Sequence, residues 1–221
     1  VASRGLGGVY KRPIEYPISA TLKTTLAAAY GRYTYASNPN VTITNDAQAS
    51  VDNSNPVFNF GKAILKNYHQ AGLPQQAYSV GLEYRDPHYW WLGTNVNYIT
   101  ESYISVSPIA RTAIFFKNPA NGFPFPEATE ARAKELLRQE KLDPVLLLNL
   151  TGGKTWRIKG KTLGLFMSVT NLLDTHYQTG GYEQARNANF RQRNQDVSSG
   201  TPNFGNKYFQ GYGRNYFVSL Y

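Results

Sequence analysis

Residues 78–98 read YSVGLEYRDPHYWWLGTNVNY, and on either side of RDPHY every second residue apart from Thr94 is apolar or aromatic. The alternating residues are Tyr78, Val80, Leu82, Tyr84, Trp90, Leu92, Val96 and Tyr98. The residues between them are small or polar, including Glu83, except for Trp91. Because successive side chains of a β-strand point to opposite faces, this period of two predicts two strands joined by a short turn.

The same period recurs along the chain. We expect seven strands, near residues 3–11, 20–36, 70–85, 90–106, 145–158, 162–173 and 211–221. Two connections between them are very short, at 86–88 and 159–161, and three are long, at 37–69, 107–144 and 174–210. Short turns that alternate with long loops are typical of an outer-membrane β-barrel.

The side chains beside the short turns support this interpretation. Aromatic residues at these positions, which we expect to form an interfacial girdle, are Tyr84, Tyr89, Trp90, Trp91 and Trp156. In 162–173 the apolar set contains Leu163 and Leu165, which a barrel would turn toward lipid, and the opposite set contains Ser168 and Thr170. The pattern alone leaves a second alternative open, a soluble β-sandwich with exposed aromatics.

Composition narrows the class of protein. The chain has 221 residues and no run near the ~20 apolar residues that a spanning helix needs. It has no Cys, so a disulfide framework is excluded. Its net charge of +9 is scattered and accompanies no recognition helix, so we expect no nucleic-acid partner. No metal-ligand spacing, phosphate loop or nucleophile motif is present, so we expect no enzyme, no metal site and no cofactor.

The strand count suggests a part of a larger barrel. Single-chain bacterial barrels have an even number of strands, and an open sheet would leave unpaired edges in lipid. The last segment, GRNYFVSLY, alternates at Tyr216, Val218 and Leu220. We therefore expect residues 1–221 to be the C-terminal third of an antiparallel transmembrane β-barrel, ending just short of its last aromatic.

Several stretches resemble one family. They are GLEYRDPHYWWLGTNVNYI (81–99), ARAKELLRQEKLDPVLLLNLTGGKTWRI (131–158), VTNLLD (169–174), GGYEQARNANF (180–190) and FGNKYFQGYGRNYF (204–217). With them, residues 60–221 resemble the C-terminal part of TonB-dependent outer-membrane transporters, in the SusC-like subgroup with a carboxypeptidase-regulatory-like extension.

The resemblance implies a barrel of about 22 strands with long extracellular loops, a plug domain and earlier strands upstream of Val1, and active import of a glycan, peptide or metal chelate across the outer membrane of a Gram-negative type cell. It implies contact with membrane lipids and lipopolysaccharide, with TonB through the upstream part, and in some members with a surface lipoprotein lid. The alternative function is a structural or scaffolding barrel within a larger outer-membrane complex.

The connection 174–210 holds the candidate site residues. They are Tyr177, Tyr182, Glu183, Arg186, Asn187, Asn189, Phe190 and Arg191. Aromatics, planar amides and Arg suit sugar or peptide recognition. The alternative is packing between loops, which we favour because these residues belong to the common pattern of the resembled subgroup.

Two further features leave alternatives open. Thr129 is expected to cap a helix over ATEARAKELLRQEK, with a Glu130–Lys134 pair and with Leu136 and Leu137 toward the barrel rim, as a lid or as a solvated brace. The basic residues Arg85, Arg157, Lys159 and Lys161 flank the short turns, where they meet anionic headgroups or water.

Overall fold

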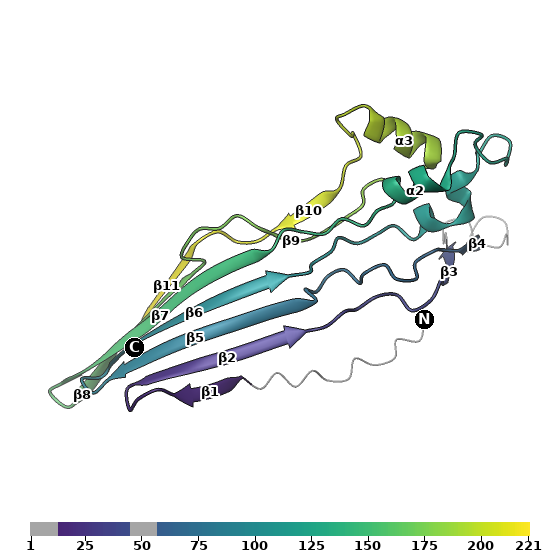
Figure 1. Cartoon of the computed structure of the whole chain (residues 1–221). Helices are drawn as coiled ribbons and strands as arrows, with labels where there is room; N and C mark the ends of the chain where they lie inside the picture. The colour runs from purple at the N-terminus through teal and green to yellow at the C-terminus, as the bar shows by residue number, and fades with distance from the viewer. Residues whose placement is uncertain (1–12, 45–56) are drawn as a thin grey trace.

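The computed structural model describes residues 13–44 and 57–221, and within them seven strands form one antiparallel sheet (Figure 1). These strands, in their order across the sheet, are β1 (Ile14–Pro17), β2 (Leu22–Tyr30), β5 (Gln76–Asp86), β6 (Trp90–Thr100), β7 (Val145–Ile158), β8 (Lys161–Thr170) and β11 (Asn215–Leu220). Each strand lies beside the sheet strand that precedes it in the chain. The predicted all-β, antiparallel fold class is confirmed.

Short and long connections alternate as predicted. Residues 18–21, 87–89 and 159–160 make the short turns, and residues 31–75, 101–144 and 171–214 make the long connections. All the short turns lie at one end of the sheet, and the long connections extend from the other end (Figure 1).

The long connections carry the remaining elements. They contain the two-stranded sheets β3–β4 (Asn40–Thr44 and Val57–Lys62) and β9–β10 (Gln178–Tyr182 and Lys207–Gln210), together with η1 (Ile109–Arg111), η2 (Ala113–Phe116), α2 (Glu130–Leu136) and α3 (Phe190–Ser198). Among the described residues, no helix combines the length and the apolar character needed to cross a bilayer.

Some strand boundaries differ from the prediction. The predicted strand 3–11 lies outside the described residues, and β1, which was not predicted, is the first strand of the sheet. Its Pro17 is tolerated because a strand at a sheet edge needs fewer backbone donors. The expected strand 90–106 ends at Thr100, because Glu101 adopts a left-handed backbone with φ of +56°.

The pairing register places apolar side chains on one face of the sheet. Leu26 on β2 lies opposite Val80 on β5, which lies opposite Val96 on β6, and Val96 lies opposite Leu148 on β7. A parallel row contains Leu82, Thr94, Leu150, Val169 and Tyr216. Residues that pair directly share a face, so these rows form one continuous apolar surface.

The opposite face of the sheet is more polar, although Trp91, Phe166 and Phe217 also lie on it. Asn95 Nδ2 donates to Ser79 Oγ over 2.8 Å, and Asn97 Nδ2 donates to Asn95 Oδ1 over 2.5 Å. Asn149 lies directly opposite Asn95 on the next strand. Amide and hydroxyl groups on this face therefore satisfy one another both within β6 and between β6 and β5.

The buried hydrophobic core lies outside the sheet. Of the buried hydrophobic side chains among the described residues, only Val145, the first residue of β7, belongs to the large sheet. On the apolar face, Val80 remains 48% exposed, Leu82 43% and Leu163 42%. These side chains do not meet in a dry centre, as a two-layer sandwich would require.

Candidate functional site

The three long connections pack on one another at one end of the sheet, and we call this region the loop assembly (residues 31–75, 101–144 and 171–214, with 45–56 outside the described part) (Figure 1). One hydrophobic cluster holds Ala110, Phe115, Phe125, Ala133, Leu136 and Phe190. Phe190 is 1% exposed, and its ring lies 5.9 Å from that of Phe115 in an edge-on arrangement. Aromatic pairs of this kind add to the stabilisation from burial alone.

A buried ion pair joins two of the connections. Arg111 Nη1 and Nη2 each donate to one oxygen of Glu183, both over 2.6 Å. The side chain of Arg111 is 1% exposed and that of Glu183 is 9% exposed. The Ser107 amide donates to Glu183 Oε2 over 2.7 Å, so the carboxylate has partners on both oxygens.

The third connection contributes an aromatic ring to this pair. The Arg111 guanidinium lies 4.7 Å from the ring centre of Tyr68, whose hydroxyl donates to the Leu137 carbonyl. Burial lowers the pKa of Arg111, but the hydrogen bonds and charge of Glu183 outweigh it, so the pKa is raised and the guanidinium stays charged. Tyr68, Arg111 and Glu183 thus form a clasp across all three connections.

A second set of contacts lies where the connections leave the sheet. The His69 ring stacks on Tyr103 with centres 3.9 Å apart and planes 7° apart. Tyr103 donates to Glu101, which also pairs with Lys141. Burial, followed by the hydrogen bond to Glu101, raises the pKa of Tyr103 to about 12. Gln139 adds hydrogen bonds to the backbone of His69, so these contacts also join different connections.

The expected helix in 101–144 is present but shorter. Thr129 accepts from the Arg132 amide, as a cap should, and α2 ends at Leu136. Arg132 pairs with Glu135, whereas the expected Glu130–Lys134 ion pair is absent from the described contacts. Leu136 is buried in the hydrophobic cluster of the loop assembly, so its expected place at a barrel rim is corrected.

The helix α3 was not predicted from the sequence. Asn189 and Gln192 form a reciprocal capping box at its start. The signal was present as Asn189 followed three residues later by Gln192, but FRQRNQDVS has little apolar periodicity to reveal a helix.

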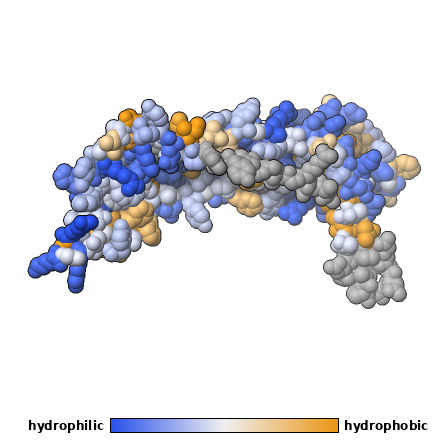
Figure 2. Space-filling view, turned by 90° about the horizontal axis from the view of Figure 1, so that it is seen from below, coloured by the Kyte–Doolittle hydropathy of each residue, from blue (hydrophilic) through white to orange (hydrophobic). Residues whose placement is uncertain are grey.

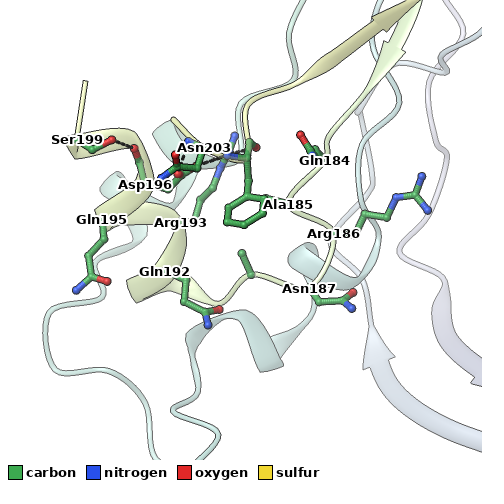
Figure 3. Close-up of a pocket in the computed structure, with 12 residues that line it drawn as sticks. Gln184, Ala185, Arg186, Asn187, Gln192, Arg193, Gln195, Asp196, Ser199 and Asn203 are labelled. Atoms are coloured by element: carbon green, nitrogen blue, oxygen red, sulfur yellow. Dashed lines mark hydrogen bonds and ion pairs between the residues drawn. The ribbon is translucent and has the colours of Figure 1, made fainter. Parts of the chain in front are cut away.

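A concave pocket of about 790 Å³ lies between α3 and the segment that precedes it (Figure 3). Its lining is Gln184, Ala185, Arg186, Asn187, Ala188, Gln192, Arg193, Gln195, Asp196, Ser199, Asn203 and Phe204. Arg193, Asp196 and Asn203 point toward one another, whereas Arg186 points away from α3 (Figure 3).

The polar groups of this pocket are only partly satisfied. Asp196 accepts from the Asn203 amide over 2.7 Å, and Arg193 donates to the Phe204 carbonyl over 3.3 Å. Gln184 Oε1 is buried and accepts no hydrogen bond from the described residues. Planar amides beside an exposed Phe204 ring are suited to a polar ligand with one flat apolar face.

The structure separates the predicted site residues into two groups. Glu183 and Phe190 are buried in loop packing, and Asn189 caps α3. Arg191 pairs with Glu127 at 2.6 Å on the surface and lies over the Phe125 ring. These four residues therefore stabilise the loop assembly.

The other predicted residues lie closer to open space. Arg186 and Asn187 line the pocket, and Tyr182 lies under the Arg186 guanidinium and forms a tilted ring contact with Phe209. Tyr177 lies outside the pocket lining, where its carbonyl accepts from the Gly211 amide. Arg111 was missed by the prediction, although an Arg within the apolar run PIARTAIFF is the type of residue that needs a buried partner.

The aromatics beside the short turns do not all share one face. Tyr84 and Trp90 lie on the apolar face with ring centres 5.2 Å apart, and Trp156 pairs with Leu163 on the same face. Trp91 pairs with Gly153 on the opposite face, so its place in the predicted girdle stays a prediction. Tyr89 lies in the turn at φ +64° and is stacked by Arg157. A neighbour of Trp90 in a strand must face the other way, which explains why Trp90 and Trp91 lie on opposite faces.

No protein-family model and no curated protein sequence matches the chain.

Proposed function

We propose that this chain is a wall segment and loop region of a TonB-dependent outer-membrane transporter, the C-terminal part of a barrel of about 22 strands. The observation that carries the proposal is the apolar face of the sheet, which nothing in the described residues covers. An exposed apolar surface that spans six strands needs lipid or another protein against it.

Three further observations support a barrel wall. Each strand pairs with the preceding strand of the sheet, as in an up-and-down barrel. β1 and β11 each lack a second neighbour among the described residues, and a sheet in lipid needs its edges closed by further strands. Hydrogen-bonded polar residues such as Asn95, Asn97 and Ser79 lie on the other face, which suits a wet lumen or contact with a plug.

In this proposal the chain performs no covalent chemistry. The apolar face anchors the wall in lipid and lipopolysaccharide, the polar face lines the lumen, and the loop assembly shapes the outer mouth. TonB acts through the upstream part of the protein, and a lipoprotein lid or a larger complex would meet the loops. The pocket beside α3 is the first place to seek substrate contact.

The orientation of the faces can be tested with spin labels in the full-length protein reconstituted in lipid vesicles. Met167→Cys places a label on the apolar face, and Ser168→Cys places one on the polar face one residue away. We expect the label at 167 to collide with oxygen dissolved in lipid and the label at 168 to avoid it. Equal exposure of both labels to a water-soluble nickel reagent would contradict the proposal.

Uptake separates transport from scaffolding. A strain that lacks the gene, a complemented strain and a strain with an altered TonB box are compared on labelled glycans, peptides and metal chelates. We expect one substrate class to require both the gene and the box. A barrel present in the outer membrane with no change in uptake would favour the scaffolding alternative.

A further inference from the structure

The β7–β8 hairpin projects beyond its neighbours in the sheet. The pairing of β7 with β6 ends at Lys154 opposite Trp90, but the pairing of β7 with β8 continues to Ile158 opposite Lys161. Four residues at ~3.3 Å each give an overhang of about 13 Å. The turn of this hairpin is the outermost point at the short-turn end (Figure 1).

The apolar face continues onto the overhang. Trp156 pairs with Leu163, and Ile158 follows on the same face. Trp156 is 37% exposed, Ile158 54% and Leu163 42%. An overhang that only met water would have no reason to keep this alternation, so its apolar side lies against the same surroundings as the rest of the face.

Three lysines lie at the border of this apolar side. Lys154 and Lys161 lie on the apolar face, and Lys159 lies at the turn with φ +48°. Lys154 Nζ donates to the His88 carbonyl over 2.9 Å. Neither Lys159 nor Lys161 forms an ion pair with any residue that the structure describes. The outermost tip at the left of Figure 2 is correspondingly hydrophilic.

Carboxylates do not neutralise these charges. Residues 144–173 contain no Asp or Glu. At the neighbouring turn, Asp86 is already engaged by Tyr84 and by the amide and ring of His88. Arg157 lies on the polar face, where it stacks on Tyr89. The free cations therefore face an apolar surface with no acidic partner of their own.

We propose that Lys154, Lys159 and Lys161, together with Trp156, form a binding surface for the headgroups of anionic phospholipids in the leaflet at the short-turn end. Lysine stems lie along apolar surface while the ammonium groups reach the phosphate layer. A Trp beside them is suited to the same interfacial depth. Free phosphate would satisfy the charges but not the apolar stripe, which is why a lipid is the occupant. This inference rests on the proposed membrane location of the apolar face.

The test uses the full-length protein in vesicles that contain either brominated phosphatidylglycerol or brominated phosphatidylcholine at equal mole fraction. Bromine quenches nearby tryptophan fluorescence, and subtraction of the Trp156→Phe variant isolates the signal of Trp156. Each lysine near an anionic surface strengthens attraction about fivefold before screening. We expect Trp156 to prefer the anionic lipid five- to tenfold, and less at high salt.

Matched variants separate the outcomes. Lys159→Gln with Lys161→Gln should reduce the preference to less than twofold, whereas Lys134→Gln with Arg138→Gln in the loop assembly should leave it unchanged; circular dichroism checks that each keeps its sheet. Equal quenching by both lipids in the unaltered protein would overturn the inference and leave the proposed function standing. No quenching by either lipid would overturn both.

Discussion

The buried pair of Arg111 and Glu183 leads to a sharp prediction about the loop assembly. Glu183→Gln keeps the size of the side chain but removes its charge. The Arg111 guanidinium, 1% exposed, would then face a neutral amide, with the Ser107 and Leu137 carbonyls as its remaining hydrogen-bond partners. Arg111 Nε has no acceptor among the described residues, and no other carboxylate pairs with Arg111 there, so the Tyr68 ring and the two carbonyls offset only part of the loss.

The magnitude follows from the burial of the pair. Removing one partner of a buried ion pair costs about 3–5 kcal/mol, because the remaining charge stays in a poorly solvating environment. At 1.4 kcal/mol per factor of ten, the equilibrium constant for local opening should rise by about 100- to 4,000-fold. The effect should be confined to the loop assembly, since both residues lie outside the large sheet.

Amide hydrogen exchange of the full-length protein measures this opening. The Ser107 amide, which donates to Glu183, and the Glu183 amide, which donates to the Ser105 carbonyl, should both exchange faster in the variant. The matched control is Glu127→Gln. The Glu127–Arg191 pair joins the same two connections at the same 2.6 Å, but its side chains are 41% and 47% exposed.

The control should leave exchange nearly unchanged, because water solvates either charge once its partner is lost. Equal effects of Glu183→Gln and Glu127→Gln would refute the reasoning from burial. A double variant, Arg111→Met with Glu183→Leu, should regain much of the lost protection, because apolar side chains need no compensating charge there.

Three further predictions concern the same region. Phe190→Ala should destabilise the loop assembly by about 3–5 kcal/mol, seen as faster proteolysis within 171–214, and unchanged cleavage would contradict the role of this ring. Asn189→Ala should cost about 1 kcal/mol and speed exchange at the Gln192 amide alone, while general loosening would show that more than the cap was lost. Because the pKa of Tyr103 is raised from 10.0 to about 12, its neutral form stabilises the fold below pH 10, and this contribution is lost as the pH rises through 12. The phenolate absorbance that Tyr103→Phe removes should titrate near pH 12, and a midpoint near 10 would argue against burial.

The sheet was predictable because its signal is local and repeated. The strands expected at 145–158 and 162–173 match β7 and β8 within a few residues, since a period of two over ten or more residues is hard to mistake. Strand ends were less certain. Glu101 ends β6 through its backbone conformation, for which the sequence around it carries no Gly or Pro as a warning.

The loop assembly was predictable only in part. Loop packing was the favoured role for Glu183 and Phe190, and both are buried. The sequence did not reveal their partners, because Arg111 and Phe115 lie about 70 residues away along the chain. Pairing over such separations depends on the whole fold. The prediction for Tyr177 and for direct substrate contact at Arg186 stays a prediction.

Because the clasp joins all three connections, the loop assembly also helps to set the register of the strands. If one strand of the sheet shifted its register by two residues, every side chain would stay on the same face of the sheet. Contacts with lipid and lumen would therefore not disfavour the shifted register. Such a slip would move one connection by about 7 Å relative to the next. That shift is far larger than the 2.6 Å between Arg111 and Glu183, so it would break this ion pair. The loop assembly thereby favours the single strand register in which Arg111 pairs with Glu183. A shifted register would leave Arg111 without its carboxylate partner and would loosen the loop assembly.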